Sequence, residues 1–445
     1  MKWFKRAVLV FSVFLAALAV VPLFVSLDDY RPQIETMVSD KLKEPVTLRK
    51  LALRGLPLPH VVIEGIEVGK AGDHLKAGKV AVTPDLLSML SSTKVIRSID
   101  IDGLLITQRA LDKIPQWTKT DPKAPPAAFK VVVSEIRLND ASLQLQKKKL
   151  GPFDAEVDIG DDGLPLRALL SARDGKLKAS LLPADKGRLR LAVDARDWSL
   201  PLGPPMKFDE LKVSGFATPT SLDLRQVESK LYQGKIGGTM EIDWQKGLRL
   251  KGQLAVDAVE LRELVPLFSP SAKISGRLNA KPVFSGETSK PEQIAAVMRL
   301  ETPFDIRNGV LQGIDLQRAA TQLIKRESGG ETRFDTLTGN FAMDRGTQRI
   351  TNLKVTSGSL GAEGNVTIAP DKSLSGRINA QVGSTLMVPL NISGTVDSPM
   401  ALPSGASMAG AALGSVVLPG VGTAAGAKVG NWAEGLFGGR KDAKK

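Results

Sequence analysis

The residues that could do nucleophilic or acid–base chemistry are few in this sequence, and their spacing does not favour it. The chain has no cysteine and two histidines, His60 and His74, so it offers no thiolate and no histidine-rich metal site. His60 opens a predicted strand and His74 lies in the loop AGDHLKAG, where we expect both side chains to face solvent. The sequence contains no phosphate-binding P-loop, no G-x-S-x-G elbow and no H-E-x-x-H zinc motif.

The remaining polar residues fit structural roles. Carboxylates mostly alternate with apolar residues, as in SIDIDG and AEVDIG, which places them on the polar face of strands. Serines in SGGETR and LPSGAS have no histidine near them in sequence and suit turns. We therefore expect a protein that is not an enzyme and that uses no cofactor and no metal.

The elements that would position any site are predominantly short strands. Apolar and polar residues alternate in GGTMEIDW, LRLKGQLAVDA and VPLNISGTV, which is the period of a strand with one apolar face. The 42 glycines and 27 prolines supply turns. The sequence predicts a mainly β, largely antiparallel fold with a few short helices, among them LDDYRPQIETMVSDKLKEPV, TPDLLSML and a helix at about 315–327.

One six-residue pattern occurs twice, as SGRLNA from Ser275 to Ala280 and as SGRINA from Ser375 to Ala380. In both copies polar residues alternate with small or apolar ones, so each predicts a strand with one apolar face. Two occupants of that face remain open: a second layer of protein, or something that is not protein.

The N-terminus predicts a membrane anchor. Lys2, Lys5 and Arg6 precede an uncharged run from Ala7 to Leu27, close to the about 20 residues that a transmembrane helix needs. The positive charge favours a cytoplasmic N-terminus, with the bulk of the chain exported. A cleaved signal peptide is the alternative, because Ala17-Leu18-Ala19 resembles a cleavage site. The net charge of +13 then suits anionic lipid headgroups, and we expect no nucleic-acid partner because no such motif occurs.

The C-terminal tail differs in composition from the rest. No charged residue occurs between Pro403 and Ala427, where glycine and alanine dominate. A second membrane span, a pair of short helices that dock on the sheet or on a partner, and a mobile tail all remain open. The predicted organisation is: anchor 1–27, N-terminal helix and β domain 28–117, linker 118–128, middle β region 129–290, C-terminal β domain 291–400 and Gly/Ala-rich tail 401–445.

Several stretches resemble the AsmA family, a group of Gram-negative envelope proteins that includes TamB-like members. They are LDDYRPQIETMVSDKLKEPVTLRKLALRGLPLPHVVIEGIEVG near the N-terminus, and FDIRNGVLQGIDLQRAATQLI and the segment from TRFDTLTGNF to SLSGRINAQV near the C-terminus. The middle region matches only in its strand rhythm. The resemblance implies an elongated, curved antiparallel sheet that forms an open groove with an apolar interior, in a periplasmic protein held in the inner membrane by a single helix.

The resemblance implies a function in lipid handling and brings no catalytic residues. We expect phospholipid, or another acyl lipid, to be carried between the envelope membranes, with a role in outer-membrane biogenesis. The alternative is a scaffold or modulator of outer-membrane protein assembly without a lipid conduit. The tail could contact an outer-membrane or periplasmic partner protein. The alternation of side chains along each strand places Arg277 and Arg377 on the outer side. The candidate groove lining is Leu278, Leu353, Val355, Val366, Ile378, Val382, Leu390 and Ile392.

Overall fold

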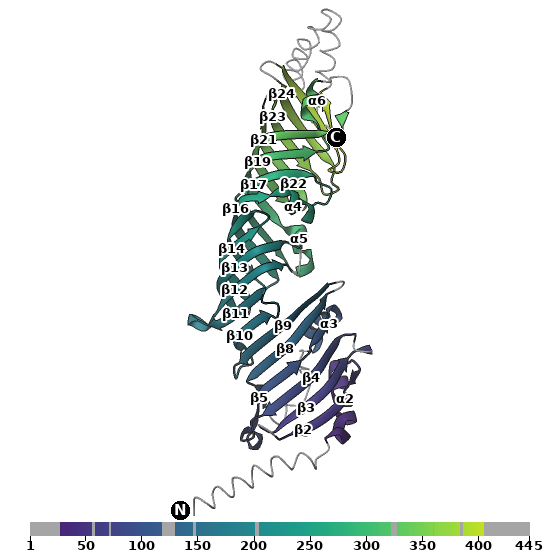
Figure 1. Cartoon of the computed structure of the whole chain (residues 1–445), viewed down its shortest axis with the longest axis vertical. Coiled ribbons are helices and arrows are strands. Elements are labelled where there is room, and N and C mark those ends of the chain that lie inside the picture. The colour runs from purple at the N-terminus through teal and green to yellow at the C-terminus, as the bar shows by residue number, and fades with distance from the viewer. Residues whose placement is uncertain are drawn as a thin grey trace, which may run out of the picture. The chain divides into compact units, whose positions relative to one another are not determined.

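The computed structural model shows that the described part of the chain is built mainly of strands, with a few short helices (Figure 1). It describes residues 27–55, 58–70, 73–117, 130–145, 148–200, 204–321, 327–358, 360–382 and 386–404. Its contacts divide the chain into two compact units, Met1–Ala195 and Arg196–Lys445. We call them the N-terminal unit and the C-terminal unit.

The N-terminal unit is a sheet with helices at its start. Its strands are β1 (Val46–Thr47), β2 (Lys50–Arg54), β3 (His60–Val68), β4 (Leu75–Pro84), β5 (Thr93–Asp102), β6 (Leu105–Thr107), β7 (Lys130–Val133), β8 (Glu135–Leu145), β9 (Lys148–Ile159), β10 (Pro165–Ala172), β11 (Leu177–Pro183) and the first part of β12 (Leu189–Ser199), which crosses the boundary at Ala195. Its helices are η1 (Asp28–Tyr30), α2 (Arg31–Leu42), η3 (Ser88–Leu90), α3 (Gln108–Trp117) and η4 (Asp185–Gly187).

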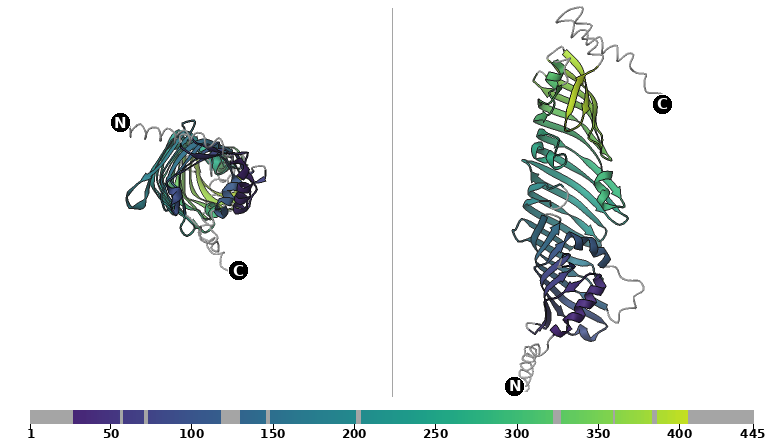
Figure 2. Two further views of the ribbon diagram at one scale, coloured as in Figure 1. Left: turned by 90° about the horizontal axis from the view of Figure 1, so that it is seen from below. Right: turned by 90° about the vertical axis from the view of Figure 1, so that its right-hand side faces the viewer.

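Helix α2 covers the first strands of this sheet. Pro32 stands in its first turn, where a missing N–H is tolerated, and Lys43 ends it in a left-handed conformation. Its apolar side packs Ile34, Val38 and Leu42 against the buried residues around Val46. Figure 2 shows the helix lying along these strands. The helix predicted after the anchor is therefore confirmed.

Most strand pairs of the N-terminal unit are antiparallel, but three are parallel. Strand β5 pairs with β7 and with β8, and β6 pairs with β8, all in parallel. These pairs join the strands on the two sides of the predicted linker 118–128, which itself lies outside the described residues. Parallel neighbours need a crossover connection, and α3 forms the described part of it.

The C-terminal unit is an antiparallel succession of long strands. They are β13 (Lys207–Thr218), β14 (Ser221–Leu231), β15 (Gly234–Asp243), β16 (Leu248–Glu260), β17 (Ile274–Ala280), β18 (Val283–Thr288), β19 (Arg299–Gln312), β20 (Glu327–Ser328), β21 (Glu331–Asp344), β22 (Thr347–Ser357), β23 (Leu360–Ile368), β24 (Leu374–Val382), β25 (Leu386–Gly394) and β26 (Pro399–Pro403). The helices are α4 (Leu261–Leu264), η5 (Val265–Leu267), η6 (Pro291–Gln293), α5 (Ile294–Val297) and α6 (Leu316–Thr321).

The mainly β prediction with few helices is confirmed, and some element bounds need correction. The helix expected at about 315–327 starts at Leu316, but Glu327 already belongs to β20, which pairs with β26. This pairing provides hydrogen bonds to backbone groups that would have bonded within a longer helix. Strand β26 also runs past the expected domain end at 400.

TPDLLSML is not a helix that begins at Pro84. Strand β4 continues to Pro84, which pairs with Ile96 of β5, and only Ser88–Leu90 are helical.

Two predicted segments cannot be compared with the structure. The anchor, including Lys2, Lys5 and Arg6, lies outside the described residues except for Leu27, and the tail is described only to Ser404. Within the described part of the chain, no helix is both long and apolar enough to cross a membrane.

Candidate functional site

Apolar side chains of the N-terminal unit form two rows that run across its strands. Each member lies opposite the next on the neighbouring strand. The first row is Val61, Val82, Ile99, Ile136, Val157, Ala168, Leu181 and Leu191. The second row is Ile63, Val80, Ile101, Leu138, Ala155, Leu170, Ala179 and Val193. Within each strand the two members are two residues apart, so both rows lie on one side of the sheet. We call this side the apolar face.

The residues between the rows point to the other side, which carries apolar residues such as Val62 and Leu169 but also charged residues held by ion pairs. We call this side the polar face. Arg137 lies 3.4 Å from Asp100 on the neighbouring strand. Arg167 pairs with Asp158 at 2.7 Å and also with Glu156. The pKa of Arg167 is raised, chiefly by its hydrogen bond to Asp158. These ion pairs distinguish the polar face from the apolar face, whose two rows hold only aliphatic side chains.

None of the sixteen side chains in the two rows is buried, and none is fully exposed. A side chain in a closed core loses nearly all its contact with water, so the apolar face is not packed as a core. Eight strands at about 4.8 Å spacing extend the face over about 34 Å. Soluble proteins rarely leave a continuous apolar surface of this extent accessible unless it binds something.

The apolar face is closed at its start. Val46, Leu48 and Val68 are buried there beneath α2, with Trp117 of α3 packed against them. His74 lies next to this cluster and is only 7% exposed, so its expected solvent-facing position was wrong. Its Nδ1 atom lies 2.9 Å from Asp73 Oδ1, and its ring meets Trp117 edge-on.

Strand β16 of the C-terminal unit shows the same alternation. Leu250, Leu254 and Val256 are half-buried on one side, while Arg249 and Lys251 are exposed on the other. Sequence reasoning recognised this alternation in LRLKGQLAVDA, but within residues 129–290 it assigned only Leu278 to the site. The rows of the N-terminal unit were missed because their alignment depends on which strands pair.

The predicted lining residues of the C-terminal unit are brought together in one cluster. Five of them are buried there: Leu353, Val355, Ile378, Leu390 and Ile392. Leu278 and Val366 are half-buried and pack against the cluster. Val382 is in β24, but its side chain lies outside the described residues. Arg277 and Arg377 are exposed, on the opposite side from Leu278 and Ile378.

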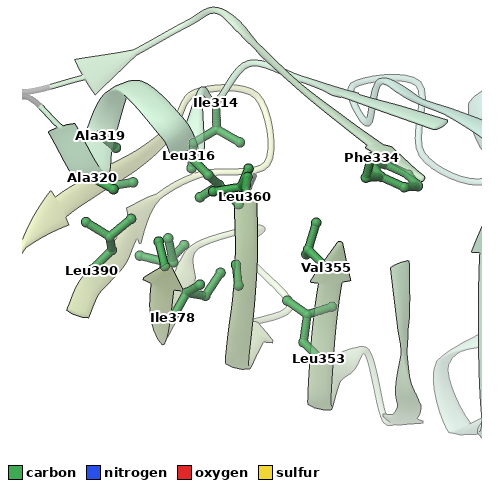
Figure 3. Packing of buried hydrophobic residues seen from close by; sticks show 14 of the residues in the cluster. Ile314, Leu316, Ala319, Ala320, Phe334, Leu353, Val355, Leu360, Ile378 and Leu390 are labelled. Carbon is green, nitrogen blue, oxygen red and sulfur yellow. The ribbon is translucent and has the colours of Figure 1, made fainter. Parts of the chain in front are cut away.

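Helix α6 covers this cluster. Leu316, Ala319 and Ala320 of α6 are at most 3% exposed and face the strands that carry Leu360 and Leu390 (Figure 3). Asp315 Oδ1 accepts a hydrogen bond from the Arg318 backbone, which starts the helix. The apolar side of these strands thus has a packing role beneath a helix of the chain itself, and its assignment as a lipid lining stays a prediction.

Three carboxylates of the polar face lie close enough to share a cation: Glu135, Glu156 and Asp158. Arg137 Nε lies 2.6 Å from Glu135 Oε1, and Arg167 contacts both of the others. The two guanidinium groups already neutralise most of this charge, so the cluster is an ion-pair network across β8, β9 and β10.

Two protein-family models match the chain. The model of the YhdP protein family matches residues 1–274, which is more than half of the sequence. The chain belongs to the YhdP family. The AsmA family model matches residues 211–353, and both models describe AsmA-like envelope proteins. Neither a curated protein nor a solved structure matched the chain.

The YhdP match places the middle region within the family. Residues 129–290, which by sequence shared only a strand rhythm with AsmA proteins, lie almost wholly inside the YhdP match and partly inside the AsmA match. The YhdP match also contains both rows of the apolar face. The covered cluster lies partly inside the AsmA match, which contains Leu316 and Leu353, whereas Ile378 lies beyond both matches.

Proposed function

We propose that this YhdP-family chain is a periplasmic, inner-membrane-anchored protein that binds phospholipid acyl chains on its apolar face. It would contribute to phospholipid transport between the envelope membranes and to outer-membrane biogenesis, without catalysing a reaction. The observation that carries the proposal is the partial exposure of all sixteen aliphatic side chains in two adjacent rows. Family membership supports a role in the envelope.

The size of the face suits a hydrocarbon chain. One leaflet of a bilayer has an acyl layer of about 15 Å, half of the about 30 Å hydrocarbon core, and the two rows are about twice as long. An apolar contact of about 300 Å² is worth about 7 kcal/mol at about 25 cal/mol per Å². Part of this is lost in ordering the lipid, which leaves weak binding of the kind that transfer requires.

The chemistry of the face favours sliding over a fixed pose. Its rows consist of valine, isoleucine, leucine and alanine, which offer no hydrogen bond to a headgroup. A lipid on this face would therefore gain nearly the same contact energy at successive positions. Selectivity for one headgroup would have to arise elsewhere.

Site-specific photocrosslinking tests the proposal with a matched control. Leu170 belongs to the second row, and Leu169, its neighbour in the chain, points to the polar face; both are half-buried. A benzophenone amino acid at position 170 of the full-length protein should form phospholipid adducts in a Gram-negative host, detected by mass spectrometry, whereas position 169 should not. Equal adduct yields at both positions, or none at either in folded protein, would sink the proposal and favour the assembly scaffold.

A further inference from the structure

The turn between β4 and β5 exposes three leucines. Leu87 is 85% exposed, Leu90 is 92% exposed and Leu86 is 49% exposed. A single exposed leucine is ordinary on a protein surface, but three in one turn form an apolar tip that water solvates poorly.

This tip is held outward by hydrogen bonds. Asp85 Oδ1 accepts from the backbone N–H groups of Leu87 and Ser88, both at 3.1 Å. The Val95 N–H donates to Ser88 Oγ at 2.8 Å, which fastens the turn to the start of β5. The hydrogen bond from Ser88 is the largest cause of the lowered pKa of Asp85. The leucines are therefore presented by an ordered turn.

The chain enters the N-terminal unit at the end of the strands that carries this turn. Asp28 Oδ1 accepts a hydrogen bond from the Leu51 N–H at 3.0 Å. Leu51 lies opposite Ile63, and Ile63 opposite Val80 of β4, the strand that leads into the turn. The uncharged run from Ala7 to Leu27, the proposed anchor, immediately precedes Asp28 in the sequence.

The surroundings of the turn suit a membrane surface. Leu58, in the connection between β2 and β3, is 42% exposed and lies at the same end of the sheet, where Arg54 pairs with His60. Basic residues stand at the base of the turn: Arg97, which pairs with Asp85, and Lys130, which lies opposite Thr93. Leucines at a tip with basic side chains behind them match the acyl boundary and the anionic headgroups of a bilayer.

We propose that the turn 85–92 inserts its leucines into the surface of the membrane that holds the anchor, so that the edge of the apolar face at these strand ends, beside Val82 and Ile99, meets the bilayer. The inference deepens the proposed function and rests on it, because it names the place where lipid enters the face. The binding partner that we propose for this tip is a lipid surface. A protein partner and a second copy of the chain are outcomes that would overturn it.

Because the chain has no cysteine, a single introduced cysteine can be labelled without background. We would label full-length Leu87→Cys and Leu90→Cys with the fluorophore NBD in vesicles of phosphatidylethanolamine and phosphatidylglycerol. The control is Asp174→Cys, in the exposed turn between β10 and β11 at the opposite end of the strands. The two turn positions should show blue-shifted emission and quenching by nitroxide-labelled lipid, and the control should be quenched by aqueous iodide.

Two results would overturn the inference. One is iodide quenching at positions 87 and 90 equal to that at 174. The other is a blue shift that grows with protein concentration and is insensitive to nitroxide lipid, which indicates a protein contact. The crosslinking at Leu170 tests the apolar face separately from the turn. If the turn is embedded in lipid but position 170 gives no lipid adducts, the proposed function is contradicted and the membrane contact of the turn is not.

Discussion

The ring of Phe334 lies over Gly309 on the neighbouring strand. The two residues are directly opposite each other in β21 and β19, and a Cβ atom added to Gly309 would lie 2.3 Å from Cζ of Phe334. Phe284 lies over Gly252, and Phe304 over Gly339, in the same way. Glycine on one strand thus makes room for a phenylalanine ring on the next, at three places in the C-terminal unit.

Replacing Gly309 by alanine should destabilise the C-terminal unit by about 1–3 kcal/mol, because the ring must leave a buried position or the strands must separate. Phe334 is 3% exposed and has little space to move. Thermal unfolding followed by circular dichroism measures the change.

Gly361→Ala in β23 is the matched control. Its added Cβ meets only Gln381 Cβ, at an ordinary 3.8 Å, and alanine restricts the unfolded chain more than glycine does. We expect a neutral or slightly stabilising effect. Equal destabilisation by both substitutions would show that the Phe–Gly contact has no special role.

Charges placed on the two apolar regions should have opposite consequences. Ile378 is 5% exposed beneath α6, so Ile378→Asp buries an unpaired carboxylate, costs several kcal/mol and unfolds the C-terminal unit. Leu170 keeps contact with water, so Leu170→Asp should leave the protein folded and remove bound lipid. Limited proteolysis and lipid mass spectrometry of both variants test this. A folded Ile378→Asp protein would contradict the packing role of the cluster.

The repeated hexapeptide shows how far sequence reasoning reached. Parity correctly placed Arg277 and Arg377 outside and Leu278 and Ile378 on the apolar side. It could not show that Ile378 is buried while Leu278 is half-buried. That difference depends on where α6 lies, which is a long-range contact that local alternation does not encode.

The apolar face of the N-terminal unit could be predicted only in part for the same reason. The alternation in SIDIDG marks Ile99 and Ile101 as members of one face, but their partners Ile136 and Leu138 come from a parallel strand beyond the linker. A one-residue change in this register would have placed the charged residues on the same side as the isoleucines. Register across a crossover is fixed by tertiary packing, so the rows appear only in the structure.

The carboxylate of Asp102 should make the parallel junction of β5 and β8 sensitive to acid. Its pKa is lowered because Lys79 Nζ donates to Oδ2 and Asn139 Nδ2 donates to Oδ1. A lowered folded-state pKa means that the stabilisation is fully present above the unfolded value of about 3.9 and is lost as pH falls through the folded value. The Asp102→Asn protein should therefore be less stable than the wild type by at most about 1 kcal/mol at neutral pH, with the difference vanishing once the pH falls below the lowered pKa of folded Asp102.

Denaturant unfolding at several pH values measures this difference. Lys79→Met should reproduce the same pH dependence, since it removes the other half of the ion pair. A difference that persists unchanged into strong acid would show that Asp102 stabilises the junction by packing alone.

Two lysine–glutamate pairs of the N-terminal unit should differ in strength because they differ in burial. Lys113 of α3 pairs with Glu44, whose side chain is 14% exposed, whereas Lys76 pairs with Glu67, which is 40% exposed. Lys113→Met leaves the Glu44 carboxylate without its ammonium partner in a mostly desolvated position, so we expect a loss of about 2 kcal/mol. Lys76→Met should cost less than about 1 kcal/mol, because water solvates Glu67 instead. Unfolding free energies of the two variants in the same buffer give the comparison. An equal cost for both would contradict the expectation that burial of Glu44 makes its pair with Lys113 the stronger one.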